Sequence, residues 1–186
     1  MSDNAVYSLC KDSEGGMWAG TYFGGINYYS PKYSLFEKYY PDNSKESISG
    51  NAVREICEYY LGNIWIGTED FGLNKLNPKT GEITQFVPTG KDGSIAYSNI
   101  HGLLAVGNDL WIGTFEHGLD IMNIRTGKVR KHYNTGLGKG DLKSNFIVSF
   151  FQTKSGGLYV GSAYDLYKYI PKIDGFESIK EIPKQI

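Results

Sequence analysis

The chain has 186 residues, of which 24 are glycine, 15 % are aromatic and only 40 % are hydrophobic. This composition favours many short strands joined by tight turns over helices. The net charge is −1, with no basic stripe, which excludes the electrostatic footprint of a nucleic-acid-binding protein. No apolar run is long enough for a membrane span, and the first residues lack the basic and apolar parts of a signal peptide.

One four-residue segment recurs along the chain. It reads WAGT at 18–21, WIGT at 65–68, WIGT at 111–114 and YVGS at 159–162, so its aromatic residue returns after 47, 46 and 48 residues. An asparagine opens a short apolar run 14, 14, 12 and 14 residues ahead of these aromatic residues, at Asn4, Asn51, Asn99 and Asn145. Two markers with one period are typical of repeat proteins, in which each unit buries its face on the next.

Each repeat contains four runs rich in β-branched and aromatic residues, bounded by Gly, Asn, Asp or Pro, and we call these predicted strands A to D. The interval from Asn51 to Trp65 holds two strands and one turn, too short for the crossover that parallel neighbours need, so the sheets should be antiparallel. The predicted strands are 5–11, 17–21, 25–29 and 35–40 in the first repeat, 51–59, 64–68, 73–77 and 83–87 in the second, 100–106, 110–114, 119–123 and 129–134 in the third, and 146–152, 158–162, 166–170 and 176–182 in the fourth.

The sequence therefore predicts an all-β fold, a single β-propeller array over 1–186 with four consecutive four-stranded antiparallel blades of about 47 residues. The predicted blades are 4–50, 51–98, 99–144 and 145–186. Alternate hairpin turns fall on opposite edges of a blade. We call the edge that holds the B–C turns and the connectors between blades the B–C rim, and the opposite edge the A–B rim.

The pattern of Asn, a small apolar strand, Asp and Gly, the Trp segment and a Gly-Leu pair resembles the two-component regulator propeller repeat. Blade 1 shows it at Asn4, Asp12, Trp18 to Thr21 and Gly25; Asp12 has no counterpart at Glu58, and blade 4 replaces Trp by Tyr159 and Gly by Asp165. The resemblance implies a non-catalytic, ligand-sensing segment of the periplasmic or extracellular part of a hybrid two-component sensor of the gut Bacteroidetes type. Such sensors carry a separate histidine kinase and respond to breakdown products of polysaccharides.

The repeated aromatic residues Trp18, Trp65 and Trp111 have two interpretations. A flat ring suits a sugar, but a residue needed identically in every blade more often solves the same packing problem each time, and we favour core positions. Cys10 and Cys57 occupy the same place in adjacent repeats, which predicts buried free thiols on neighbouring inner strands.

Function should lie where the blades differ, and the B–C turns differ most. They combine aromatic rings with carboxylates or imidazole, which suit the apolar faces and the hydroxyls of an oligosaccharide, although solvated loop tips are the plainer interpretation of any one residue. The candidate ligand-binding residues are Tyr22, Phe23, Glu69, Asp70, Phe71, Phe115, Glu116, His117 and Tyr164.

We predict no cofactor, no metal site and no catalytic residue. The histidines do not share metal-ligand spacing, and no nucleophile motif occurs. One alternative is an enzyme, a propeller lyase resembling the streptogramin lyases, in which His and Glu should converge with perturbed pKa values. Another is a plain protein-interaction scaffold.

The ends of the array should be uncovered. The chain starts on an inner strand at Ala5 and finishes on an outer strand near Ile182, and neither end shows the polar cap that repeat arrays need. We therefore expect a partial propeller or half of a dimeric ring, with self-association through the terminal blades.

Overall fold

The computed structural model describes residues 1–31, 36–42, 44–59 and 61–180. Within these ranges it contains 16 β-strands and no helix, and the strands form four separate four-stranded sheets. Neighbouring strands are antiparallel throughout and follow one another in chain order. The predicted all-β fold of four antiparallel blades is confirmed.

Each blade runs from an inner to an outer strand. Blade 1 contains β1 (Val6–Lys11), β2 (Met17–Thr21), β3 (Ile26–Tyr29) and β4 (Phe36–Tyr39). Blade 2 contains β5 (Val53–Glu58), β6 (Ile64–Thr68), β7 (Leu73–Leu76) and β8 (Ile83–Phe86). Blade 3 contains β9 (Ile100–Val106), β10 (Asp109–Thr114), β11 (Leu119–Asn123) and β12 (Lys128–Tyr133). Blade 4 contains β13 (Ile147–Gln152), β14 (Leu158–Ser162), β15 (Leu166–Ile170) and β16 (Gly175–Ser178); the predicted end of its outer strand, near Ile182, lies outside the described residues.

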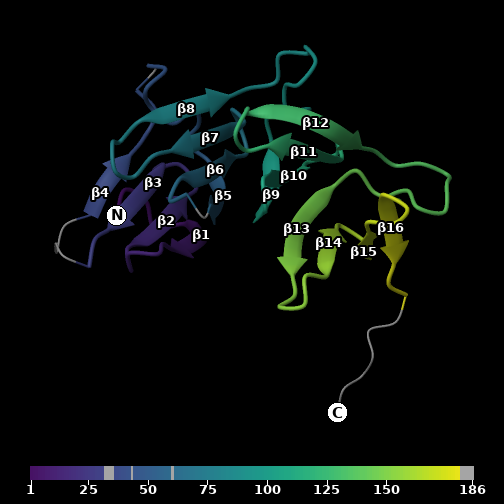
Figure 1. Ribbon diagram of the computed structural model, residues 1–186. Coiled ribbons are helices and arrows are strands. Elements are labelled where there is room, and N and C mark those ends of the chain that lie inside the picture. Colours follow the sequence, from purple (N-terminus) through teal and green to yellow (C-terminus); the bar gives the residue numbers. More distant parts are fainter. Residues whose placement is uncertain (32–35, 43, 60, 181–186) are drawn as a thin grey trace.

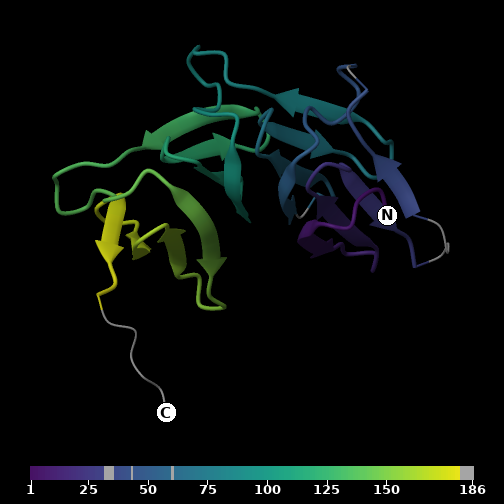
Figure 2. The same ribbon diagram turned by 180° about the vertical axis from the view of Figure 1, so that it is seen from behind.

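The four sheets stand side by side in an arc (Figures 1 and 2). The inner strands β1, β5, β9 and β13 line the inside of the arc, and each packs against the next. The outer strands β4, β8, β12 and β16 lie on its convex side. Blades 1 and 4 do not meet, so the array is an open, partial propeller.

A separate hydrophobic core fills each junction between blades. Trp18 packs with residues of blade 2 such as Val53, Trp65 packs with residues of blade 3 such as Ile100, and Trp111 packs with blade 4. All three tryptophans are buried, which confirms that they are core residues and not exposed sugar platforms.

The glycine and threonine that end the Trp segments of blades 1 to 3 have two structural roles. The glycine lies against the first residue of the next inner strand: a Cβ at Gly67 would come within 2.6 Å of Ile100 Cγ2. The threonine hydroxyl is buried and donates a hydrogen bond across the B–C turn, from Thr68 Oγ1 to the carbonyl of Gly72 at 3.0 Å. Gly72 has a φ of +95°, which only glycine adopts at low cost.

Two sequence alignments between blades need correction. The Gly72 amide donates a hydrogen bond to the carbonyl of Ser98, and the Gly118 amide donates in the same way to the carbonyl of Asn145. Ser98 rather than Asn99 therefore corresponds to Asn145. The residue that corresponds to Asp12 is Tyr59 rather than Glu58, because both begin the A–B turn with the same backbone hydrogen bonds. The A–B turn of blade 3 is one residue shorter than that of blade 2, so Trp111 follows Trp65 after 46 residues instead of 47.

Cys10 and Cys57 are both free, as predicted, but they are half-buried rather than buried. Each packs against the core that joins its blade to the next one. Burial raises the pKa of both thiols, to about 11 for Cys57, so they are protonated and weakly reactive at neutral pH.

Candidate functional site

Every inner strand contains a β-bulge at the same position. In blade 1 the partner of Val6 is Thr21 and the partner of Ser8 is Gly20, so Tyr7 is the extra residue between them. A bulge of this kind re-aims a side chain out of the regular alternation of a strand. The corresponding extra residues of blades 2, 3 and 4 are Arg54, His101 and Val148.

The B–C turn of each blade lies next to this bulge. The first amide of the turn donates to the connector residue just before the inner strand, from Glu69 N to the carbonyl of Ala52 at 2.9 Å, with equivalent bonds in the other blades. This backbone link confirms that the B–C turns and the connectors share one rim. It brings the bulged side chain of each strand close to the first side chain of its turn.

Three of these pairs make contacts of different chemistry. In blade 1 the rings of Tyr7 and Tyr22 are 5.0 Å apart. In blade 2 Arg54 Nη1 and Glu69 Oε1 form an ion pair at 2.6 Å. In blade 3 the rings of His101 and Phe115 are 5.7 Å apart. Blade 4 has Val148 and Ala163 at these positions, which offer only small apolar groups.

Contacts between neighbouring blades join the pairs into one row. The Arg54 guanidinium lies 5.9 Å from the centre of the Tyr7 ring, and Glu69 Oε1 lies 3.9 Å from His101 Nε2. Phe146, at the entrance to β13, packs 4.8 Å from Phe115. At the blade 1 end of the row, the ring of Phe23 lies 4.1 Å from the ring of Tyr22. We call this set the bulge row; its members are Phe23, Tyr22, Tyr7, Arg54, Glu69, His101, Phe115 and Phe146.

His101 is the buried centre of the bulge row. Its side chain is 8 % exposed, and its Nδ1 atom has no hydrogen-bond partner among the described residues. Burial, together with the nearby Arg54 guanidinium, lowers the pKa of His101 to about 4, against the opposing effect of Glu69. The imidazole is therefore neutral at physiological pH, and one polar atom of the row is left unsatisfied.

A cavity of about 290 Å³ adjoins the row between the first two inner strands. It is lined by Val6, Tyr7, Arg54 and Glu55. Burial raises the pKa of Glu55 to about 7, against the opposing effect of Arg54. This carboxyl group can therefore change its charge near neutral pH beside the row.

The structure brings four of the nine predicted ligand-binding residues into the row, namely Tyr22, Phe23, Glu69 and Phe115. The other five lie on the same turns but make separate contacts. Asp70 accepts a hydrogen bond from the Asn51 amide at 3.1 Å, and His117 stacks on Tyr97 with the rings 3.7 Å apart. Phe71, Glu116 and Tyr164 are exposed and lie outside the row.

Sequence reasoning missed Tyr7, Arg54, His101 and Phe146, because these residues sit inside inner strands that read as framework. A signal was present. Tyr7, Arg54, His101 and Val148 are each 47 residues apart, and they differ in charge and shape while the position before them is always Val or Ile. Variation at one repeated position beside a constant one marks a site that packing does not determine.

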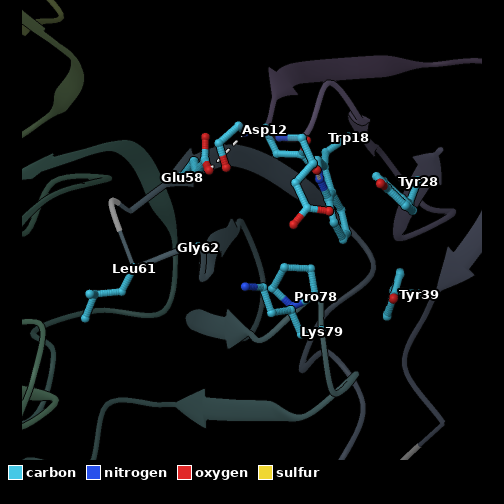
Figure 3. A pocket seen from close by; sticks show the side chains of 11 residues that line it. Asp12, Trp18, Tyr28, Tyr39, Glu58, Leu61, Gly62, Pro78 and Lys79 are labelled. Atoms are coloured by element: carbon cyan, nitrogen blue, oxygen red, sulfur yellow. Dashed lines mark hydrogen bonds between the residues drawn. The ribbon is translucent and has the colours of Figure 1, made fainter. Parts of the chain in front are cut away.

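A second kind of cavity lies on the A–B rim. The one between blades 1 and 2 has a volume of about 390 Å³; Trp18, Tyr28 and Tyr39 of blade 1 line it together with Pro78 and Lys79 of blade 2 (Figure 3). Cavities of about 370 and 380 Å³ occupy the two other junctions of this rim, so the feature recurs with the architecture.

The polar groups of the A–B rim cavity support its own turn. Asp12 accepts from Trp18 Nε1 at 2.8 Å and from the Gly16 amide at 2.7 Å, and Glu58 accepts from the Ser13 amide at 3.2 Å. Both carboxylates therefore stabilise the A–B turn of blade 1. We therefore interpret this cavity as a packing notch between blades.

Among the residues in the described ranges, no three His, Cys, Asp or Glu side chains gather in a way that could hold a metal ion. The same ranges contain no helix long and apolar enough to cross a membrane.

Comparison with known proteins identifies the fold. The family model described as two component regulator propeller matches residues 1–23. The extracellular domain assigned to the hybrid two component system BT3049 from B. thetaiotaomicron superposes with a TM-score of 0.80 at 20 % identity, over 96 % of this chain and 24 % of that one. The extracellular domain assigned to the one component system BT4673 of the same organism gives 0.74 at 20 % identity, over 96 % and 25 %.

A structure from another functional class is also similar. Virginiamycin B lyase from Staphylococcus aureus superposes with a TM-score of 0.68 at 15 % identity, over 97 % of this chain and 56 % of that one. No curated protein sequence matches the chain at a significant level. The chain spans about a quarter of the length of the two sensor domains, and these likenesses establish a propeller fold.

Proposed function

We propose that the chain is a non-catalytic, ligand-sensing propeller segment of the periplasmic or extracellular part of a two-component sensor, and that it binds an oligosaccharide along the bulge row. The match of residues 1–23 to the regulator propeller model and the likeness to two sensor domains support the sensor assignment. In such a protein a separate histidine kinase would transmit the signal.

One observation carries the location of the site. The same bulge occurs in all four inner strands, yet its extra residue is Tyr7, Arg54, His101 or Val148. Framework positions in a repeat array stay alike because every junction has the same packing problem. A residue that is re-aimed out of the sheet and changed from blade to blade is free to serve recognition instead.

The chemistry of the row suits an uncharged sugar. Tyr7, Tyr22 and Phe115 offer aromatic rings for the apolar face of a pyranose. Arg54 and Glu69 are already paired, so together they present donors and acceptors for hydroxyl groups without a net charge. We expect a neutral oligosaccharide to bind better than a uronic or sulfated one of the same length.

The contact between His101 and Glu69 is the feature that would favour a lyase. Their geometry does not suit catalysis at neutral pH. A histidine with a pKa of about 4 is a weak general base at that pH, and the Glu69 carboxylate is held by Arg54 at 2.6 Å. We therefore infer a binding role for both residues.

A thermal-shift screen with neutral and acidic oligosaccharides tests the proposal, because a ligand that binds only the folded state raises its stability by mass action, by about 2.7 kcal/mol at a hundred times Kd. We expect Tyr22→Ala and Phe115→Ala to weaken the response. Lys79→Ala, on the A–B rim, is the matched control and should leave it unchanged.

Backbone NMR shifts then locate the bound sugar. Shifts on β1, β5 and β9 near the bulges would support the bulge row. Shifts confined to Asp12, Lys79 and Lys128 would place the site on the A–B rim, and a complete lack of response to every sugar would overturn the glycan assignment.

A further inference from the structure

One position of the inner strands changes its chemistry in blade 2. The residue that pairs with the glycine of the recurring four-residue segment is Ser8 in blade 1, Gly102 in blade 3 and Ser149 in blade 4. In blade 2 the same position holds Glu55. Three blades form their sheets with a small residue here, so the packing of a blade does not require a carboxyl group at this place.

The Glu55 carboxyl group has no partner in the described part of the chain. It forms no ion pair and accepts no hydrogen bond there, because the guanidinium of its neighbour Arg54 is held at 2.6 Å by Glu69 instead. Burial raises the pKa of Glu55 to about 7, and the charge of Arg54 opposes this only in part. The ionised form of a half-buried, unpartnered acid is costly, and a cation placed beside it would offset that cost.

The cavity of about 290 Å³ places this acid next to an aromatic ring. Its lining includes Tyr7 on β1 and both Arg54 and Glu55 on β5, so it lies between two blades that are both present in the chain. The face of a tyrosine ring attracts cations. Because Arg54 and Glu69 neutralise each other, the ionised Glu55 gives the cavity a net negative charge. The volume lies just below the range of about 300–1,000 Å³ of small-molecule pockets, which suits one sugar unit.

We propose that this cavity binds the protonated amino group of an amino sugar, with the ammonium beside Glu55 and the rest of the oligosaccharide along the bulge row. The inference rests on the proposed function, since the row supplies the other contacts and the cavity adds a preference for a positive charge. A hydroxyl or N-acetyl group in the same place would leave the carboxylate without a charged partner. Hydrogen bonds between charged groups are roughly twice as strong as neutral ones. The expected order of affinity is therefore amino, then neutral, then acidic sugars.

Three trisaccharides that differ only at the second carbon of each ring test the proposal by isothermal titration calorimetry. They are the β-1,4-linked trisaccharides of glucosamine, N-acetylglucosamine and glucose. At pH 7 we expect the full chain to bind the first at least about tenfold more tightly than the other two, as for one hydrogen bond between charged groups. Glu55→Gln should remove this preference without changing the affinity for the glucose trisaccharide. Equal affinities in the parent chain, or a preference that survives in Glu55→Gln, would overturn the inference.

Glu58→Gln is the matched control, because it removes the same charge from the same strand. Glu58 accepts a hydrogen bond from the Ser13 amide at 3.2 Å and lines the cavity of the A–B rim. This variant should keep the full preference for the glucosamine trisaccharide. An equal loss in Glu58→Gln and Glu55→Gln would show that the net charge of the chain attracts the amine, and would contradict a site at Glu55. Circular dichroism spectra that match the parent chain verify that both variants fold.

The pH dependence gives a second readout. As the pH falls from 7 to 5, Glu55 takes up a proton while the amine keeps its charge, so the affinity for the glucosamine trisaccharide should fall at least about fivefold. Glu55→Gln should show no such fall, and an equal fall in that variant would assign the effect to another group. The charged and titratable side chains around Glu55 are Arg54, Cys57 and Glu58 of its own strand, Tyr7, Cys10 and Lys11 of β1, and His101 of β9. Only histidine among these has an ordinary pKa in this range, and burial holds the pKa of His101 at about 4.

The row variants separate a failure of this inference from a failure of the proposed function. If Tyr22→Ala and Phe115→Ala weaken binding of the glucose trisaccharide but the amino sugar has no advantage, the bulge row stands and the amino site is refuted. If the glucosamine trisaccharide binds through Glu55 while those two variants bind it as tightly as the parent chain, the amino site stands and the row is refuted. A lack of binding of all three trisaccharides overturns the inference, and the wider oligosaccharide screen then decides the proposed function.

Discussion

Two tryptophans at equivalent positions differ in one hydrogen bond, and this difference predicts unequal effects of the same substitution. Trp18 and Trp65 are both fully buried. Trp18 Nε1 donates to Asp12 Oδ2 at 2.8 Å, whereas Trp65 Nε1 has no partner among the described residues, because Tyr59 replaces the aspartate. We expect Trp18→Phe to destabilise the chain more than Trp65→Phe does.

The magnitude follows from the polar groups, because the lost ring volume is common to both variants. Removing a buried, unpartnered N–H relieves a cost of about 1–3 kcal/mol, and removing a hydrogen bond to a carboxylate that water can reach costs about 1 kcal/mol. The difference between the two variants should be about 2–4 kcal/mol. Urea midpoints followed by circular dichroism measure it.

A double-mutant cycle separates this effect from fraying of the terminal blade. Asp12→Ala should destabilise the parent chain more than it destabilises the Trp18→Phe background, where the bond to Trp18 is already lost and only the bonds to the backbone amides of the turn remain to be broken. Equal urea midpoints for the two Trp variants, or fully additive effects of Asp12→Ala and Trp18→Phe, would refute the reasoning.

Three more predictions follow from burial, backbone geometry and charge. Trp65→Ala should cost about 3–5 kcal/mol as a core truncation, and an unchanged urea midpoint would refute the core assignment. Gly72→Ala should lower the midpoint more than Gly62→Ala, because both positions have positive φ but only at Gly72 would a Cβ meet a backbone oxygen, at 2.6 Å; equal losses would contradict this. The unfolded chain protonates His101 near pH 6.5 and the folded chain only near pH 4, so this residue should remove about 2–3 kcal/mol of stability as the pH falls from 7 to 4.5. Urea midpoints at the two pH values should therefore differ less in His101→Phe than in the parent chain, and an identical pH dependence would show that His101 is not buried in its neutral form.

The strands could be predicted from sequence because each blade repeats the same physical solution. The Trp segment marks the second strand, and the glycine and threonine after it, such as Gly67 and Thr68, close the junction and the B–C turn in one motif. The spacing of the repeats and the opposite placement of successive turns then determined which loops share a rim. These features depend on local sequence and on the period, which a single chain reveals.

The bulge row could not be predicted in the same way, because a bulge is invisible in an alternating pattern. Tyr7 and Arg54 read as ordinary members of a strand, and only the pairing with the second strand shows that each is an extra residue. The ion pair of Arg54 with Glu69 depends on that displacement. Turns are visible in sequence, so the four turn residues of the row could be named as candidates, whereas their strand partners could not.

The hydrogen bonds that hold the connectors are another feature that the sequence alone does not reveal. The third strand carries an acceptor that holds the connector backbone: the Ser49 amide donates to Asn74 Oδ1 at 2.8 Å, and the Ala96 amide donates to Asp120 Oδ2 at 2.7 Å. In blade 4 the hydroxyl of Tyr167 replaces the carbonyl or carboxylate. Three side chains of different type perform one task, so their equivalence appears only when the bonds are compared.

The bulge frees one side chain of each inner strand from the packing between blades. Val53 is buried in the junction and Ile56 packs against the same core, while Arg54 between them leaves the sheet and meets the B–C turn. In a regular strand a change at this position would have to fit the neighbouring blade, because alternate side chains face it. At a bulge the change meets the B–C turns, the neighbouring bulge residue or, for His101, the connector residue Phe146. This is why Tyr7, Arg54, His101 and Val148 can differ so widely at one position of a repeat, although the residue before that position is always Val or Ile.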